Sequence, residues 1–166
     1  MKKISWLLAA ASALLIPAVQ SSATTPIDTG TTGSALDCSG AAASQGVIWP
    51  PNHSMIAESI IGVTDAPGIV PTITITAIQQ DEPLEVDGSG NTEPDGSGVG
   101  TATAYVRAER AGPGTGRIYF ISFSATDSLG NSCTNQSVQV FVPHDQGPRS
   151  SPVDTNARYD STLALN

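Results

Sequence analysis

The segment from Asp81 to Asp95 holds the densest group of side chains that could bind an ion. Six carboxylates lie within these fifteen residues, and no lysine or arginine accompanies them. Calcium takes roughly six to eight oxygen ligands from carboxylates, carbonyls and water, and a loop between strands can supply several of them. We therefore expect a weak calcium site assembled from several loops. Its predicted ligands are Asp81, Glu82, Asp87, Glu109 and Asp127.

Two features of this segment argue against a dedicated calcium loop. Counted from Asp87, the sixth and twelfth positions are Thr92 and Gly98, where an EF-hand requires glycine and glutamate. The sequence Asp-Gly-Ser-Gly also occurs twice, at 87–90 and at 95–98, and glycine-serine runs are typical of flexible segments. The alternative interpretation is a solvated acidic loop that keeps the protein soluble.

Arg107, Arg110 and Arg117 fall in one predicted hairpin. Their simplest role is to offset the acids. The functional alternative is a site for a carbohydrate or a carboxylate, with Tyr105 or Tyr119 as a stacking surface. The alternation of residue types around Tyr119 places that ring on the inward face.

The two histidines, His53 and His144, lie near opposite ends of the predicted domain. A hydrolase needs a nucleophile, a base and an orienting acid within hydrogen-bond reach of one another. The chain has no Gly-x-Ser-x-Gly sequence, which would mark such a nucleophile. We therefore predict no catalytic residue and a protein that is not an enzyme, with a secreted hydrolase as the minority alternative.

The elements that must position these residues are predicted to be strands. Only 13% of the chain is charged, while glycine and proline number 16 and 12, a composition that favours turns and short strands over helices. Apolar and small polar residues alternate with period two in runs bounded by glycine, proline and aspartate. The predicted strands are 46–49, 56–63, 72–79, 101–110, 117–126 and 132–142. Six or seven strands of this kind are typical of an all-β, two-sheet antiparallel sandwich of the immunoglobulin-like class.

The alternation also assigns the face that each strand turns to the core. The residues expected to point inward are Tyr119, Ile121, Phe123, Ala125, Val138, Val140 and Val142. A register shift of one residue would turn the whole set outward. Trp49 and the prolines that follow it are expected to close one end of the core.

Six short motifs lie between residues 49 and 146. They are Trp49-Pro50-Pro51-Asn52-His53, Gln80-Asp81-Glu82-Pro83, Arg107-Ala108-Glu109-Arg110, Gly116-Arg117-Ile118-Tyr119, Ala125-Thr126-Asp127 with Gly130-Asn131, and Val142-Pro143-His144-Asp145-Gln146. In this order they resemble bacterial extracellular immunoglobulin-like modules related to hyalin-repeat and fibronectin-III-like domains. The resemblance covers roughly 36–146 and implies a β-sandwich that serves as a non-catalytic module of secreted or surface proteins. Relatives often have Gly-Asp-Gly-Asp-Thr in the acidic loop, whereas 88–92 read Gly-Ser-Gly-Asn-Thr, so a ligand role of those two aspartates is not implied.

Residues 1–23 have the pattern of a signal peptide. Lys2 and Lys3 precede the apolar stretch 6–19, and Ser-Ser-Ala at 21–23 suits signal peptidase. The alternative, a membrane anchor, needs about 20 apolar residues, so we expect a secreted or cell-surface protein without membrane insertion of the mature chain. The net charge is -8 and becomes about -10 without the two lysines. Such a charge disfavours nucleic acid, whose phosphates bind clustered cations.

Cys38 and Cys133 are the two cysteines of the chain. In an oxidising compartment such a pair can close in one way only, so we predict a disulfide between them. It would tie the segment before the first strand to the start of the last. Two free thiols are the alternative, and a zinc site is disfavoured because no further cysteine or histidine stands at ligand spacing.

These observations divide the chain into four expected parts. They are a signal peptide at 1–23, a polar N-terminal extension at 24–35, an immunoglobulin-like sandwich at 36–146 and a flexible C-terminal tail at 147–166. The expected function is a secreted binding or structural module for adhesion or surface interaction. Its expected partner is an extracellular protein or glycan, and calcium is its only expected cofactor. A carbohydrate-binding module is the alternative.

Overall fold

The computed structural model of the chain describes residues 35–90, 92–148 and 150–164. The predicted signal peptide, and all but the last residue of the predicted N-terminal extension, lie outside the described residues. Within the described ranges, no helix has the length and apolar character that crossing a bilayer requires.

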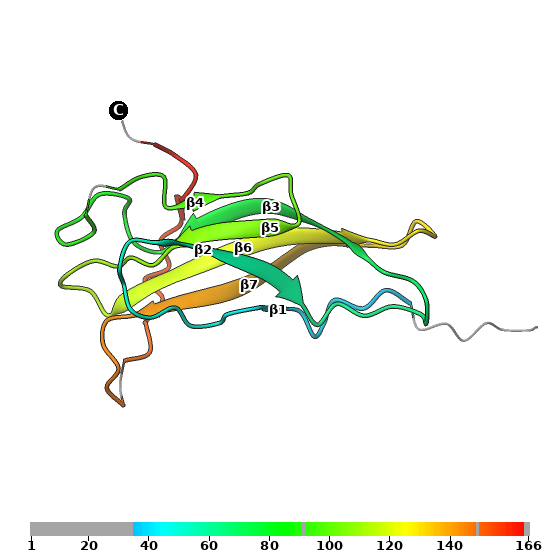
Figure 1. The fold of residues 1–166 in the computed structure, drawn as a ribbon, viewed down its shortest axis with the longest axis horizontal. Helices are drawn as coiled ribbons and strands as arrows, with labels where there is room; N and C mark the ends of the chain where they lie inside the picture. The colour runs from blue at the N-terminus through cyan, green and yellow to red at the C-terminus, as the bar shows by residue number, and fades with distance from the viewer. Residues whose placement is uncertain (1–34, 91, 149, 165–166) are drawn as a thin grey trace, which may run out of the picture. The chain divides into compact units, whose positions relative to one another are not determined.

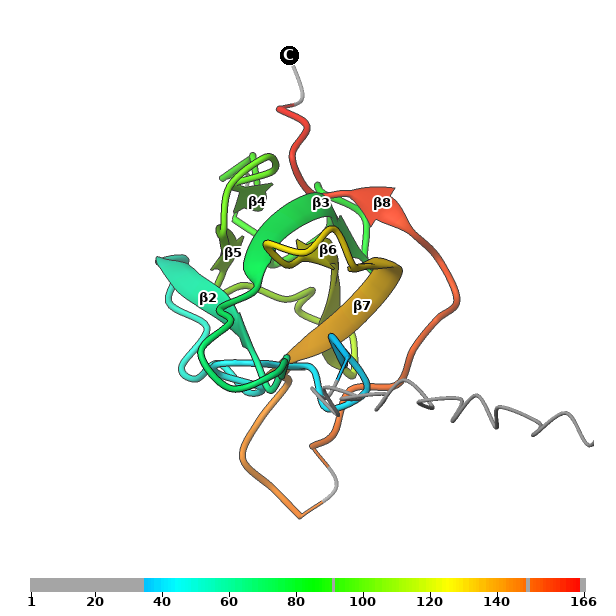
Figure 2. The ribbon, with the colours of Figure 1, turned by 90° about the vertical axis from the view of Figure 1, so that its right-hand side faces the viewer.

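Two four-stranded sheets form a sandwich (Figure 1, Figure 2). Sheet I consists, in spatial order, of β1 (Ala42–Ala43), β2 (Met55–Ile61), β5 (Thr103–Arg107) and β4 (Gly96–Ser97). Sheet II consists of β7 (Ser132–Pro143), β6 (Gly116–Thr126), β3 (Thr72–Gln80) and β8 (Tyr159–Asp160). Neighbouring strands in both sheets run antiparallel. The prediction of an all-β, two-sheet antiparallel sandwich is therefore confirmed.

Five of the six predicted strands are present with small shifts at their ends, and the exception is 46–49. There Val47 makes only an isolated parallel bridge with Phe141 of β7. Pro50 and Pro51 follow closely, and a proline has no N–H with which to extend the pairing. The structure adds β1, β4 and β8, each of 2 residues, which is too short for a period-two pattern to be recognised.

The alternation in β6 and β7 predicted the core face correctly. All members of the predicted inward set are buried, and Tyr119, Ile121 and Phe123 have no accessible surface. In the pairing of β6 with β7, Tyr119 lies opposite Val140 and Ile121 lies opposite Val138. Buried residues of β2, β3 and β5 belong to the same hydrophobic cluster, so both sheets contribute to one core.

Trp49 does not close the core, contrary to the prediction. Its side chain is 41% exposed, whereas Ile48 before it is 4% exposed and belongs to the core. Ile48 donates its backbone N–H to Phe141 O at 2.8 Å, which fixes it against β7. Neighbouring side chains of an extended segment point to opposite sides, so the burial of Ile48 turns Trp49 outward.

The predicted disulfide joins Cys38 to Cys133, with the Cα atoms 6.4 Å apart. Cys133 stands near the start of β7, opposite Ala125 near the end of β6. The disulfide therefore attaches the N-terminal segment to sheet II at the end of the sandwich that carries the β6–β7 turn. In the chain-entropy model, a link across such a long stretch of chain stabilises the fold by about 4 to 5 kcal/mol.

The C-terminal segment is packed against the sandwich and is not the flexible tail that the sequence predicted. β8 pairs with Gln79 and Gln80 of β3. Directly after β8, Ser161 donates its N–H to Ile78 O at 3.0 Å and accepts at its carbonyl from Gly96 N–H at 2.7 Å. Ile78 belongs to sheet II and Gly96 to sheet I, so Ser161 connects the two sheets.

The same segment passes along the outside of sheet II (Figure 2). Phe120 projects from β6 on the side opposite the core, yet it is only 8% exposed. The guanidinium carbon of Arg158 lies 3.6 Å from the centre of its ring, which is the arrangement of a cation–π contact. Residues beyond 146 therefore cover an aromatic side chain that would otherwise lie in solvent.

Candidate functional site

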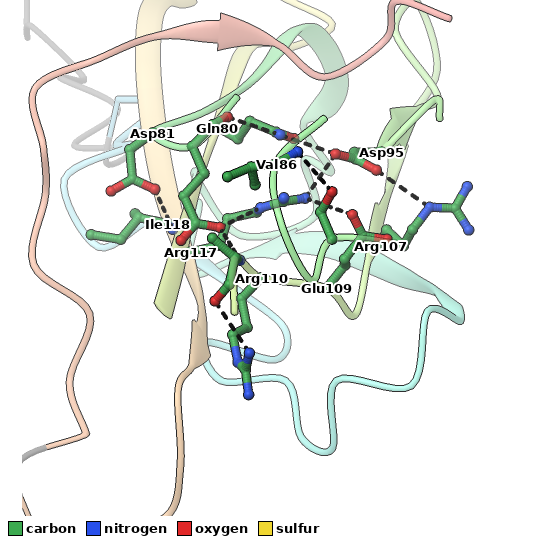
Figure 3. Close-up of polar contacts among 12 residues, drawn as sticks. Gln80, Asp81, Val86, Asp95, Arg107, Glu109, Arg110, Arg117 and Ile118 are labelled. Carbon is green, nitrogen blue, oxygen red and sulfur yellow. Dashed lines mark hydrogen bonds and ion pairs between the residues drawn. The ribbon is translucent and has the colours of Figure 1, made fainter. Parts of the chain in front are cut away.

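Arg117 lies near the start of β6 with no accessible side-chain surface, and its guanidinium faces three carboxylates (Figure 3). Nε is 3.1 Å from Glu82 Oε2, while Nη1 is 2.7 Å from Asp95 Oδ2 and 3.6 Å from Glu109 Oε1. Arg107 approaches the other oxygen of Asp95, with 3.4 Å between its Nε and Oδ1. We call these two arginines and three acids the Arg117 cluster.

The Arg117 cluster joins the two sheets at one end of the sandwich. Arg117 belongs to β6 and Glu82 follows β3, and both of these strands are in sheet II. Asp95 precedes β4 and Glu109 follows β5, and both of these strands are in sheet I. The disulfide lies near the opposite end of β6, so the sandwich has a covalent link at one end and an ionic link at the other.

Further hydrogen bonds hold two of the carboxylates in position. Glu82 Oε2 accepts from the backbone N–H of Ala111 at 2.7 Å. Asp95 Oδ2 accepts from Gln80 Nε2 at 3.0 Å. Hydrogen bonds to a charged acceptor are about twice as strong as neutral ones, and they offset part of the cost of removing these carboxylates from water.

Glu109 connects the Arg117 cluster to the surface. Its Oε2 accepts from the hydroxyl of Thr92 and lies 3.0 Å from Nδ1 of His53. The His53 side chain is 45% exposed, whereas that of Glu109 is 1% exposed. The carbonyl of His53 accepts from Arg107 Nη1 at 2.9 Å, and the carbonyl of Pro94 accepts from Arg107 Nη2 at 2.8 Å. Two nitrogens of Arg107 thus donate to backbone carbonyls, while Nη2 of Arg117 is buried without a hydrogen-bond partner among the described residues.

The protonation states of the buried groups follow from their surroundings. Burial alone would lower the pKa of Arg117, but Tyr119, Asp95 and Glu82 outweigh it and hold that pKa above the usual range. Complete burial raises the pKa of Tyr119, although the charge of Arg117 opposes this shift. The Tyr119 hydroxyl donates to the carbonyl of Arg107 at 2.9 Å. Arg117 is therefore a permanent cation and Tyr119 a permanent donor.

The five predicted calcium ligands do not form one site, and three of them have other partners. Glu82 and Glu109 belong to the Arg117 cluster, so an arginine supplies the counter-charge that the sequence assigned to calcium. Asp81 is buried, and its Oδ1 accepts from the backbone N–H of Ile118 at 2.8 Å. The calcium interpretation required unpaired acids, and the alternative required solvated ones. The acids at 81, 82 and 95 are instead paired and buried.

The other two predicted ligands lie elsewhere. Asp87 stands in an exposed loop. Asp127 is in the β6–β7 turn, where a hydrogen bond of 2.6 Å from the Asn131 side chain lowers its pKa. At roughly 3.3 Å per residue along β6, Asp127 is about 30 Å from Arg117. Among the described residues, no three His, Cys, Asp or Glu side chains are grouped so that they could hold a metal ion.

Sequence reasoning did not select Arg117 or Asp95 as site residues. A signal for Arg117 was present, because 117 shares the inward face of its strand with Tyr119 and Ile121. A charge at an inward position needs a buried partner, and the acidic segment contains the largest group of candidates. The pairing with Asp95 carried no local signal, since the two residues are far apart in the sequence.

The histidines do not complete a hydrolytic site. His53 contacts Glu109, while His144 lies 3.4 Å from Asp145 Oδ2 and 3.1 Å from the carbonyl of Gly112. Neither ring has a serine hydroxyl among its hydrogen-bond partners in the part of the chain that the structure describes. The hydrolase alternative therefore gains no support from the geometry.

Comparison with known proteins does not identify a function for this site. No protein-family model, curated protein or solved structure matches the chain. The function must therefore be argued from the residues and contacts described above.

Proposed function

We propose that this protein is an exported immunoglobulin-like module that binds an extracellular protein or glycan and catalyses no reaction. The observation that carries this proposal is the closure of the Arg117 cluster. Its acids Glu82, Asp95 and Glu109 are 6%, 0% and 1% exposed, and each faces the guanidinium of Arg117. Catalytic acids and bases must reach a substrate, whereas these groups are enclosed and hold the two sheets together.

The motifs that resemble extracellular immunoglobulin-like modules support the proposal, because they meet in space. His53 of the first motif contacts Glu109 of the third, and Arg117 of the fourth contacts Glu82 of the second. The motifs that this chain shares with such modules can be explained by one need. Each module would require the same buried ion pairs at this end of the sandwich. In that case the motif residues stabilise the fold, and residues on the outer surfaces contact the ligand.

The disulfide supports the export part of the proposal. Disulfides persist in oxidising compartments and are rare in reducing ones. The Cys38–Cys133 link ties the first described segment to β7, and a reducing cytosol would remove that stabilisation.

The proposal is tested by expressing the full chain in a bacterial host. We expect protein outside the cytoplasm to begin at Thr24, as N-terminal sequencing would show, and to adhere to isolated cell envelopes. We also expect no turnover of peptide, ester or glycoside substrates. Heat-denatured protein is the control for non-specific adhesion. Retention of residues 1–23 in cytoplasmic protein, or saturable turnover of any substrate, would contradict the proposal.

A further inference from the structure

A groove of about 460 Å³ lies where the C-terminal segment crosses from sheet II to sheet I. Its walls come from β3, β4 and the residues around β8. This volume is within the range of roughly 300 to 1,000 Å³ that is typical of small-molecule sites. Pro94 and Gly96 of the lining flank Asp95 of the Arg117 cluster, but no member of the cluster lines the groove itself.

The backbone explains why the groove is present. β3 has a register irregularity between Ile75 and Ala77, which is the position of the groove. On one side Ile75 exchanges hydrogen bonds with Thr101 O at 2.8 Å and Gly100 N at 2.9 Å. On the other side Ile78 O accepts from Ser161 N–H. Residues 100–101 therefore pair with the edge of β3 before the irregularity, and Ser161 pairs with it after the irregularity. The groove opens between these two segments.

Glycine in β4 brings the two sheets close together at the groove. A Cβ atom on Gly96 would lie 2.9 Å from both Ile78 Cγ2 and Ser161 Cβ. Such contacts are too short for a side chain, so β4 can approach β3 only with glycine at this position. The strand wall of the groove is thus a consequence of the fold, while Pro94, Gly98, Val99 and Thr162 contribute to the lining from connecting segments.

The lining of the groove is rich in neutral hydrogen-bonding groups. Thr76, Gln79, Ser97 and Thr162 supply hydroxyl and amide groups that both donate and accept. Asp160 is the one charged residue of the lining, and its Oδ1 already accepts from Thr162 N–H at 2.9 Å and Thr162 Oγ1 at 2.7 Å. A lining without a base, in a chain of net charge -8, disfavours an anionic ligand. One carboxylate is also too few for a divalent cation.

An exposed aromatic side chain, which is not itself part of the lining, stands on the strand next to the groove. Tyr105 of β5 is 42% exposed and has Ser97, which lines the groove, and Ala57 as its two cross-strand neighbours. Both neighbours are small, so they leave the faces of the ring accessible. Tyrosine combines a large apolar surface with a hydroxyl group, which suits ligands that are apolar on one face and polar at their rim.

We infer that the groove and Tyr105 together bind a neutral saccharide chain. Pyranose rings present C–H groups to an aromatic face and hydroxyl groups to hydrogen-bonding neighbours, so they match both parts of the surface. The inference rests on the proposed function as a binding module and assigns its ligand class. Tyr105 provides the stacking face, and Thr76, Gln79 and Ser97 provide hydrogen bonds to sugar hydroxyls.

Titration calorimetry with the purified protein tests the inference. The probes are neutral hexasaccharides of glucose, mannose and N-acetylglucosamine. Tyr105→Ala removes the stacking face, and Thr76→Trp fills the groove. Each change is expected to weaken binding at least about tenfold, the loss typical of an aromatic contact at the centre of an interface. Trp49→Ala is the matched control, because Trp49 is 41% exposed and lies outside the groove.

The outcomes separate this inference from the proposed function. The inference is supported if a probe binds the wild type and the control, and if both site variants bind it more weakly. The thermal midpoints of the variants must be unchanged. If no probe binds, or if binding survives in both site variants, the inference fails. The module function stands in that case if the protein still adheres to cell envelopes. Shortening of a bound probe, detected by mass spectrometry, would keep the site and overturn the non-catalytic function.

Discussion

Arg117 and Asp95 form an ion pair of 2.7 Å in which neither side chain is accessible to solvent. The pair joins β6 of sheet II to the residue that precedes β4 of sheet I. Burying two charges costs several kcal/mol per ion, so such a pair need not stabilise the fold more than apolar residues of the same volume would. Its effect becomes large when one partner is removed, because the other charge is then buried alone.

Substituting Arg117→Met should therefore lower the free energy of unfolding by about 3 to 5 kcal/mol. The variant leaves Glu82, Asp95 and Glu109 buried without the guanidinium that they face. Urea unfolding of the two proteins measures the difference. Adding Asp95→Asn to Arg117→Met should recover part of the loss, because one of the uncompensated charges is removed. A loss below about 1 kcal/mol would mean that the cluster behaves as a surface ion pair.

Glu58 should make stability depend on pH in the direction opposite to most carboxylates. It is fully buried on β2, and its Oε2 accepts from Ser44 Oγ at 2.9 Å and Gln45 N–H at 2.8 Å. Burial raises its pKa above the ordinary value of 4.5, because these two hydrogen bonds offset the desolvation only in part. The folded state therefore binds this proton more tightly than the unfolded state, so the associated stability is lost as pH rises through the folded pKa.

The measurement is urea unfolding of wild type and Glu58→Gln between pH 4 and pH 8. The variant has no carboxylate to ionise, so it should be the more stable protein at neutral pH. Its advantage should shrink as the pH falls through the folded pKa and then below the ordinary value of 4.5, where the glutamate becomes protonated in the unfolded state as well. Glu85→Gln, at an exposed position, is the control and should show no such trend. An advantage that stays constant across this range would rule out the titration of Glu58 as its cause.

Arg158 should stabilise the fold through Phe120 more than through its ion pair with Asp154. The pair has an Nη2–Oδ2 distance of 2.8 Å but is about one-third exposed on both sides, and exposed ion pairs contribute little because solvent screens them. The contact with the Phe120 ring is worth about 0.5 to 2 kcal/mol. In thermal unfolding, Arg158→Ala should therefore lower the midpoint more than Asp154→Ala. If the two variants lower the midpoint equally, the ion pair accounts for the whole stabilising effect of Arg158.

The sequence predicted those parts of the fold that a local pattern determines. Alternation placed Tyr119, Ile121 and Phe123 in the core, because successive side chains of a strand point to opposite faces. The two cysteines could pair in one way only, and they do. By contrast, the pairing of β8 with β3 depends on contacts between residues about eighty positions apart, and two residues of strand carry no periodic signal.

The acidic segment shows why the site was harder to predict than the fold. Charge spacing alone does not distinguish an acid in solvent from one that faces a buried arginine. Glu85 and Asp87 are exposed, whereas Glu82 and Asp95 are enclosed within the same stretch of chain. Only the packing of the two sheets on Arg117 determines which acids become buried. The inward position of Arg117 could have indicated a buried partner, but not which acid it would be.

The Arg117 cluster leads to a prediction about calcium binding. In the wild type, Arg117 already compensates Glu82, Asp95 and Glu109, so we expect the same thermal midpoint with millimolar calcium and with chelator. In Arg117→Met, Arg107 still approaches Asp95, and no three acidic side chains of the described residues are grouped to hold a metal ion. Calcium is therefore expected to leave the midpoint of this variant unchanged too, whereas a ligand that bound only the native state would raise it. Magnesium is the control ion, because it requires a stricter octahedral geometry. A calcium-dependent rise in the wild type would instead support the site that the sequence predicted, whose ligands are Asp81, Glu82, Asp87, Glu109 and Asp127.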